Sequence, residues 1–144
     1  GTVNVPGIVG FAKAVEIAID EMEAENKKYK KWTGTMLEKF SAVGGKLNGH
    51  LSNRLSHNLN IRFDGVQSKS IINTVSKKLA ISAGSACTSD LVEPSHVLLA
   101  LGLSEDQAHN SIRIGCNRYN TDVEIDFAIN EILNALESIA KIRI

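Results

Sequence analysis

The chain has few residues of several informative kinds. Two cysteines occur among 144 residues, far apart in sequence, so they form neither a disulfide framework nor a C-x-x-C motif. Aromatic residues make up only 5% of the chain, and basic and acidic residues number 16 each, so there is no net charge that favours nucleic acid. No apolar run approaches the roughly 20 residues that span a bilayer, and no signal peptide opens the chain. We therefore expect a cytoplasmic protein, mitochondrial in a eukaryote.

The length and the apolar content suit one globular domain. A chain of 144 residues that is 43% hydrophobic can bury a sizeable core. Its densest basic segment, 27–31, follows an acidic segment at 20–25, a pattern typical of a solvated helix rather than of a polyanion site. These features predict neither direct nucleic-acid binding nor a membrane partner.

Hydrophobic periodicity predicts a long helix at each end of the chain. Apolar residues recur at helical spacing over roughly 6–42, as one helix or two in series, and a Gly-Gly pair at 44–45 ends the pattern. Near the other end, Thr121 and Glu124 fit a capping box at the start of the last helix. The expected buried stripe of that helix consists of Ile125, Ala128, Ile129, Ile132, Leu136, Ile139 and Ala140.

Shorter patterns between these helices predict strands. The segment 57–63 alternates polar and apolar residues, and the segments 79–83 and 111–116 also have the character of strands. Short helices are expected over about 67–78 and 97–101. The sequence therefore predicts one α/β domain with three or more strands covered by helices.

Cys87 is the first candidate for chemistry. It lies in a predicted loop of small and hydroxyl-bearing residues, with the sequence Ser-Ala-Gly-Ser-Ala-Cys-Thr-Ser over 82–89. Nearby hydroxyl and backbone N–H groups could stabilise a thiolate, which is the nucleophilic form of cysteine. The alternative is a cysteine that packs as a small buried hydrophobic residue, and the local residues leave both readings open.

Arg113 is the second candidate. It stands between Ile112 and Ile114 in a predicted strand, so its guanidinium should lie on the face opposite these isoleucines. A guanidinium in that position can bind a carboxylate through two parallel hydrogen bonds, or it can simply pair with an acidic residue or remain solvated. Cys116, near the end of the same strand, is interpreted as a packing residue. The four histidines, at 50, 57, 96 and 109, show no metal-ligand spacing.

Several motifs together resemble one known family. In order and spacing, Ser85-Ala86-Cys87-Thr88-Ser89, Glu93-Pro94-Ser95, Leu101-Gly102-Leu103, Ala108-His109 and Ser111-Ile112-Arg113 resemble the C-terminal domain of NifS-like cysteine desulfurases, which are class V aminotransferases. The opening segment 1–10 resembles the start of the helix that leads into that domain. The resemblance therefore covers residues 1–144 as one C-terminal domain with its connecting helix, and the loop motif resembles the long-loop branch of the family.

The resemblance implies a function and a set of site residues. It implies a homodimeric enzyme of the aminotransferase-like fold type I that uses pyridoxal 5'-phosphate to convert L-cysteine to L-alanine. Cys87 would be the catalytic residue that carries the sulfur as a persulfide, Arg113 would bind the substrate carboxylate, and Thr2 would reach the cofactor phosphate of the other subunit. Cys87 would also be a possible ligand of a transient [2Fe-2S] cluster shared with a scaffold protein.

The resemblance also marks what this chain lacks. The lysine that anchors the cofactor, the acid that pairs with its ring nitrogen and the histidine that stacks on its ring are expected upstream of Gly1. We therefore expect the chain on its own to be inactive. The sequence departs from the family at 114–117, where Cys116 adds a second thiol, and at His96. The sulfur acceptor would serve iron–sulfur cluster assembly or thiolation of nucleic acid, and the alternative function is a non-catalytic persulfide carrier or interaction domain. A third reading, a cysteine-ligated metal module, lacks sufficient ligands.

Overall fold

A computed structural model describes residues 1–84 and 93–142. Its elements are α1 (Val5–Ser41), β1 (Gly45–Leu47), β2 (Asn58–Phe63), α2 (Ser68–Val75), β3 (Ser82–Ala83), α3 (His96–Ala100), α4 (Glu105–His109), β4 (Ser111–Gly115) and α5 (Asp122–Ile142). The strands form one antiparallel sheet in the order β1-β2-β4-β3. The predicted α/β class is confirmed, with four strands in the described part of the chain.

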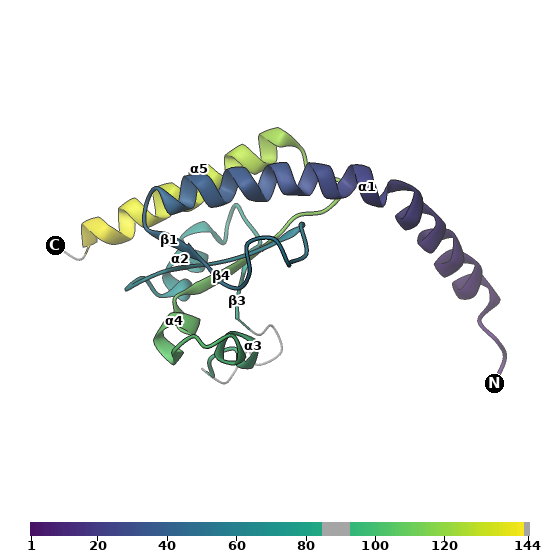
Figure 1. Ribbon diagram of the computed structural model, residues 1–144, viewed down its shortest axis with the longest axis horizontal. Helices are drawn as coiled ribbons and strands as arrows, with labels where there is room; N and C mark the ends of the chain where they lie inside the picture. The colour runs from purple at the N-terminus through teal and green to yellow at the C-terminus, as the bar shows by residue number, and fades with distance from the viewer. Residues whose placement is uncertain (85–92, 143–144) are drawn as a thin grey trace.

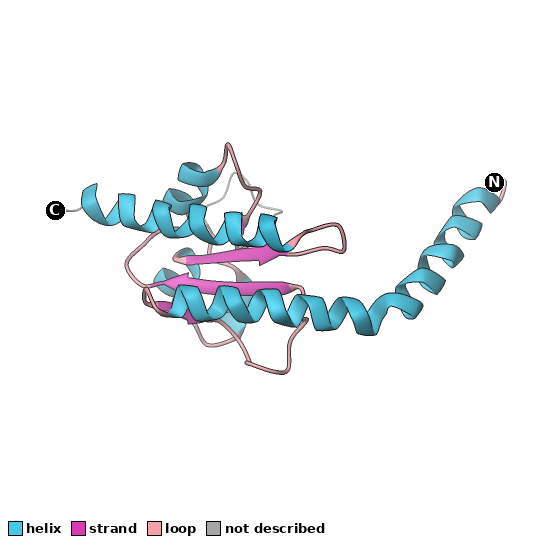
Figure 2. Cartoon of the chain, turned by 90° about the horizontal axis from the view of Figure 1, so that it is seen from above, coloured by secondary structure: helices cyan, strands magenta, loops and turns pink. Residues whose placement is uncertain are grey.

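The sheet separates two layers of helices. The long helices α1 and α5 lie on one side of it, and the short helices α3 and α4 lie on the other (Figure 1). Seen from above, α1 and α5 run next to each other over the strands (Figure 2). The core lies between this helical layer and the sheet and consists of Trp32, Met36, Phe40, Leu59, Ile61, Phe63, Ile71, Ile112, Ile114, Cys116, Ile125, Ile129 and Ile132.

The long helix predicted over 6–42 is confirmed as a single helix, α1, but its two halves differ. Trp32, Met36 and Phe40 of the second half are buried in the core. The apolar residues of the first half, which recur at the same helical spacing, are exposed: Val5, Ile8, Val9, Phe11, Val15, Ile19 and Met22. This first half projects beyond the sheet (Figures 1 and 2). The periodicity of apolar residues therefore predicted the helix but not which of these residues are buried.

The last helix begins as predicted. The Thr121 N–H donates to Glu124 Oε2 at 2.9 Å and the Glu124 N–H donates to Thr121 Oγ1 at 3.3 Å, which completes the capping box. Of the predicted stripe, Ile125, Ile129 and Ile132 are buried. Ala128, Leu136 and Ile139 are partly buried and Ala140 is exposed, whereas Ala135 is buried although it was not predicted. At 3.6 residues per turn, Ala140 falls on the edge of the stripe away from Ala135.

The strands show where sequence patterns are too short to interpret. β2 and β4 match the predictions closely, whereas only Ser82–Ala83 of the predicted strand 79–83 pairs with a neighbour. β1 was not predicted, because the Gly-Gly pair indicated only a helix end. Gly44 has a φ of +88°, and a Cβ on Gly45 would lie 2.7 Å from the Phe40 carbonyl oxygen, so a strand can begin here only with glycine. The predicted helix 67–78 is also too long, since α2 ends at Val75. No helix in the described part of the chain is long and apolar enough to cross a membrane.

Candidate functional site

The two faces of the sheet differ in polarity because side chains alternate along each strand. On β2 the buried residues alternate with partly exposed ones, and the partly exposed face carries Asn58, Asn60 and Arg62. On β4, Arg113 is exposed between the buried Ile112 and Ile114. The prediction that Arg113 lies on the face opposite the isoleucines is confirmed, and we call its face the polar face.

Arg113 has polar neighbours on both sides. Its Cα partner on β2 is Asn60 and its Cα partner on β3 is Ser82. No described acidic residue forms an ion pair with Arg113, so the interpretation of Arg113 as half of a structural ion pair has no support within residues 1–84 and 93–142. An exposed guanidinium in the middle of a strand, with no ion pair to the described residues, can bind an anion.

β3 connects Arg113 to the segment that contains Cys87. The chain leaves β3 at Gly84 and returns at Ser95, and a Cβ on Gly84 would lie 3.1 Å from the Cβ of Ser95. These two residues therefore lie against each other, one strand away from Arg113. Cys87 falls between them in the sequence and lies outside the described residues.

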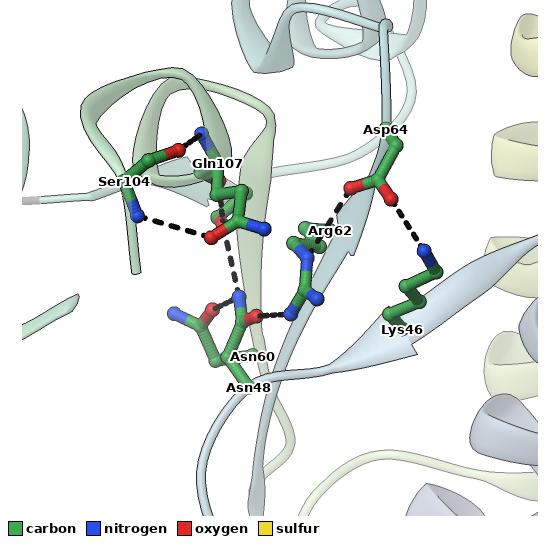
Figure 3. A network of polar contacts seen from close by, with 8 residues as sticks. Lys46, Asn48, Asn60, Arg62, Asp64, Ser104 and Gln107 are labelled. Carbon is green, nitrogen blue, oxygen red and sulfur yellow. Dashed lines mark hydrogen bonds and ion pairs between the residues drawn. The ribbon is translucent and has the colours of Figure 1, made fainter. Parts of the chain in front are cut away.

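The buried side-chain amide of Asn48 connects residues at the end of the polar face next to α4. Asn48 is 8% exposed, and its Nδ2 donates to Asn60 Oδ1 at 2.7 Å and to Ser111 Oγ at 2.8 Å. The Asn48 Oδ1 accepts from the Arg62 guanidinium at 2.8 Å (Figure 3). Ser111 in turn donates to the Gln107 carbonyl at 2.7 Å, which ties the sheet to α4. We call this set the amide network.

The outer end of the amide network is fixed by charge. Arg62 donates to Asp64 at 3.2 Å, and Lys46 donates to the same carboxylate at 2.6 Å (Figure 3). The hydrogen bond from Lys46, together with the nearby positive charges, lowers the pKa of Asp64. Asp64 is therefore ionised at neutral pH and holds Arg62 in place. The sequence pattern alone does not predict this network. The alternation over 57–63 indicated one polar face, but the contacts with Asn48 depend on the unpredicted β1.

Cys116 lies on the opposite face from Arg113. Its side chain is 6% exposed and belongs to the core, and its N–H donates to the His57 carbonyl at 2.8 Å. Burial raises the pKa of the Cys116 thiol, so it stays protonated and unreactive at neutral pH. The interpretation of Cys116 as a packing residue is confirmed, and it does not add a second thiol beside Arg113.

Thr2 is not brought near Arg113 within one chain. It precedes α1 and is exposed. The N-terminus lies beyond the projecting half of α1, away from the sheet in both views (Figures 1 and 2). Within the described residues, histidine, cysteine and acidic side chains also form no group of three that could hold a metal ion.

Comparison with known proteins identifies the family. The Aminotransferase class-V family matches residues 1–127. The chain is 42% identical over 146 residues to the cysteine desulfurase IscS of Rickettsia typhi, covering 99% of this chain and 35% of that protein. It is 43% identical over 136 residues to the cysteine desulfurase IscS of Anaeromyxobacter sp. strain K, covering 90% of this chain and 32% of that protein. The chain thus spans about a third of the length of these relatives.

Solved structures agree with this relationship. A NifS-like protein superposes with a TM-score of 0.82 at 30% identity, over 95% of this chain and 35% of that chain. The NifS-like protein from Rickettsia africae superposes with a TM-score of 0.79 at 24% identity, over 95% and 36%, and supports the fold alone. The chain belongs to the class-V aminotransferase family, where it is similar to the NifS-like cysteine desulfurases.

Proposed function

We propose that the complete protein is a cysteine desulfurase that converts L-cysteine to L-alanine and transfers the sulfur through Cys87. The observation that carries the proposal is the exposed Arg113, which lies one strand away from the segment that contains Cys87. The 42% identity to an IscS over 99% of the chain supports the same activity. Because the chain spans about 35% of that relative, the activity is proposed for the complete protein.

Arg113 binds the substrate carboxylate in this proposal. A guanidinium binds a carboxylate in a fixed plane through two hydrogen bonds, so it orients the amino acid as well as holding it. Such orientation is a large part of enzymatic rate enhancement. With its carboxylate held on β4, the substrate is bound one strand away from Gly84, where the segment that contains Cys87 begins.

Cys87 accepts the sulfur. Its thiolate attacks the sulfur of the substrate and forms an S–S bond, while the Cβ–S bond of the substrate breaks and the carbon takes up a proton to give alanine. Pyridoxal 5'-phosphate, when bound, withdraws electrons from the amino acid and so weakens the Cβ–S bond. The outer sulfur of the Cys87 persulfide then passes to an acceptor protein that serves iron–sulfur cluster assembly or thiolation of nucleic acid. As a further role, Cys87 would be a ligand of a [2Fe-2S] cluster shared with a scaffold protein.

The described residues supply little of a cofactor site. Lysines occur on α1, in and just after α2, on α5 and on β1, and the one on the polar face, Lys46, is bound to Asp64. Thr2 offers a single hydroxyl, and one neutral hydrogen bond contributes only about 0.5–1.5 kcal/mol against the roughly 8 kcal/mol of micromolar binding. In this proposal the cofactor is anchored by residues outside this chain, and we expect the isolated chain to show no desulfurase activity.

The position of Thr2 fits a dimeric enzyme. The projecting half of α1 carries Thr2 away from its own sheet, which suits a reach towards the cofactor phosphate of a second subunit (Figure 1). Exposed apolar residues on that half, such as Ile8, Val9 and Ile19, also suit burial in a larger protein. We place this protein in the cytoplasm, or in the mitochondrion of a eukaryote.

Substitution of the cysteines tests the proposed function. In the complete protein, Cys87→Ser should abolish sulfur transfer and leave the bound cofactor's visible absorbance intact, because the cofactor is held elsewhere. Cys116→Ala, which removes the buried thiol, should retain alanine formation. Normal production of alanine and persulfide by Cys87→Ser would contradict the assignment.

A second function, a non-catalytic persulfide carrier, requires no lysine for a cofactor. Lys46, the one lysine on the polar face within the described residues, is already paired with Asp64. A carrier would show no cofactor absorbance in its complete form, yet would acquire a persulfide on Cys87 from a separate desulfurase. Cofactor absorbance together with cysteine turnover would exclude this function.

A further inference from the structure

The amide network fixes which way the Asn60 side chain presents its donor. Arg62 can only donate hydrogen bonds, so the atom of Asn48 that faces it must be the carbonyl oxygen, Oδ1. The amide nitrogen of Asn48 then faces Asn60 and donates to its Oδ1. The Nδ2 group of Asn60 is consequently on the side away from Asn48 (Figure 3).

Asn60 is the direct neighbour of Arg113 across the two strands. Asn60 and Arg113 are Cα partners in the antiparallel pair of β2 and β4, and both side chains are on the polar face. Directly opposed side chains in such a pair have Cβ atoms about 4.5–5.5 Å apart. The Nδ2 of Asn60 has no hydrogen-bond acceptor among the described residues, and the side chain is partly exposed. Asn60 is therefore a preoriented donor beside a guanidinium that forms no ion pair with the described residues.

We propose that Asn60 is a second binding residue for the substrate carboxylate, donating from Nδ2 to an oxygen of the carboxylate that Arg113 binds. Asn48 and Arg62 are positioning residues, because they set the orientation of the Asn60 amide. This inference rests on the proposed function and adds a selectivity to it. With two donors aimed at one carboxylate, the site favours an amino acid over the corresponding amine that lacks the carboxylate.

An isosteric substitution at Asn60 is the sharpest test. In the complete enzyme, Asn60→Asp keeps an oxygen that accepts from Asn48 but replaces the free donor by an acceptor. We expect the KM for L-cysteine to rise about tenfold or more, as for loss of a hydrogen bond to a charged group, with kcat changed less than twofold. The KM for cysteamine, which lacks the carboxylate, should change less than twofold. A KM for L-cysteine within twofold of wild type would overturn the proposal.

Asn58 offers a matched control for that substitution. It lies on the same face of the same strand, with Gly115 as its Cα partner, and its side chain makes no hydrogen bond to the described residues. Asn58→Asp introduces the same charge farther from Arg113, so we expect a rise in KM of less than threefold. An equal rise for Asn58→Asp and Asn60→Asp would show a general effect of charge and would overturn a specific role for Asn60.

A substitution at Asn48 tests the orientation itself. Asn48→Asp still accepts from Arg62 but can no longer donate to Asn60, so the Asn60 amide should turn and present its oxygen towards Arg113. The KM for L-cysteine should then rise about fivefold with kcat little changed, although Asn48 itself is buried. An unchanged KM in a folded Asn48→Asp protein would overturn the positioning role.

A binding measurement separates this inference from the proposed function. Calorimetric titration of the complete protein with L-alanine should give a dissociation constant about tenfold higher for Asn60→Asp than for wild type, whereas ethylamine should discriminate little between them. If Arg113→Ala also leaves L-alanine binding unchanged, the proposed function fails. If Arg113→Ala weakens binding and Asn60→Asp does not, only the role of Asn60 fails.

Discussion

The two faces of the sheet use the same strands for different purposes. On the face towards α1 and α5, β2 and β4 place Leu59, Ile61 and Ile112 in a dry core. On the other face, the same strands hold an amide network at one end and the exposed Arg113 beside it. Because neighbouring residues of a strand point to opposite faces, a stable core can hold binding residues rigidly without burying them. The comparison predicts that stability and substrate binding respond to different substitutions on β4.

The largest effect on stability should come from the core face. Ile112 is fully buried, so Ile112→Ala should lower the free energy of unfolding by about 2–5 kcal/mol through lost transfer energy and the cavity left behind. Urea unfolding of the 144-residue chain, followed by circular dichroism, measures this change. Its neighbour Arg113 is the matched control, and Arg113→Ala should change the same quantity by less than about 0.5 kcal/mol. Similar losses for both variants would break the comparison.

A smaller effect is expected at the end of the polar face next to α4. Asn48→Ala removes the partner of Arg62, Asn60 and Ser111 at once, and a polar group left unpaired in a buried position costs about 1–3 kcal/mol. Asn58→Ala should change the free energy of unfolding by less than about 0.5 kcal/mol, because its side chain makes no hydrogen bond to the described residues. If both alanine variants were equally stable, the amide network would contribute nothing to the fold.

The buried thiol of Cys116 should make the free energy of unfolding depend on pH in the alkaline range. Its pKa is raised by burial, so the unfolded chain loses this proton near pH ~8.5 while the folded chain retains it. Stability from this group is therefore complete below about pH 8.5 and is lost as the pH rises further, by at most about 1.4 kcal/mol per pH unit. In a Cys87→Ser background, Cys116→Ala should flatten this loss in urea unfolding between pH 8 and 10.

The same experiment distinguishes the effect of Cys116 on stability from that of Tyr29, whose pKa is also raised. Burial, and secondarily the hydrogen bond to Glu25, raises the pKa of Tyr29 to about 12. Tyr29 therefore begins to reduce stability only above about pH 10, outside the window of the thiol. Rapid labelling of Cys116 by a thiol reagent in the folded chain at pH 8 would contradict its place in the core.

How far the sequence predicts this molecule depends on the length of each pattern. Apolar residues recur at helical spacing over long stretches of α1 and α5, and this periodicity predicted both helices. The capping box at Thr121 also predicted where α5 begins. β1 is only three residues long and begins with the second of two glycines, so it left no pattern to detect. Arg113 could be assigned to a face because Ile112 and Ile114 flank it. Its neighbour Asn60 could not be identified, because register between strands distant in sequence is set by packing rather than by local residues.

The central claim is that Arg113, exposed on the polar face, binds the carboxylate of the substrate. The most direct measurement is the KM for L-cysteine of Arg113→Ala in the complete enzyme, with the unfolding of the same variant measured alongside. Loss of a charge-assisted pair of about 1.5–3 kcal/mol predicts a KM raised at least tenfold and a free energy of unfolding within about 0.5 kcal/mol of wild type. An unchanged KM with normal turnover would contradict the account and make Arg113 an ordinary surface residue.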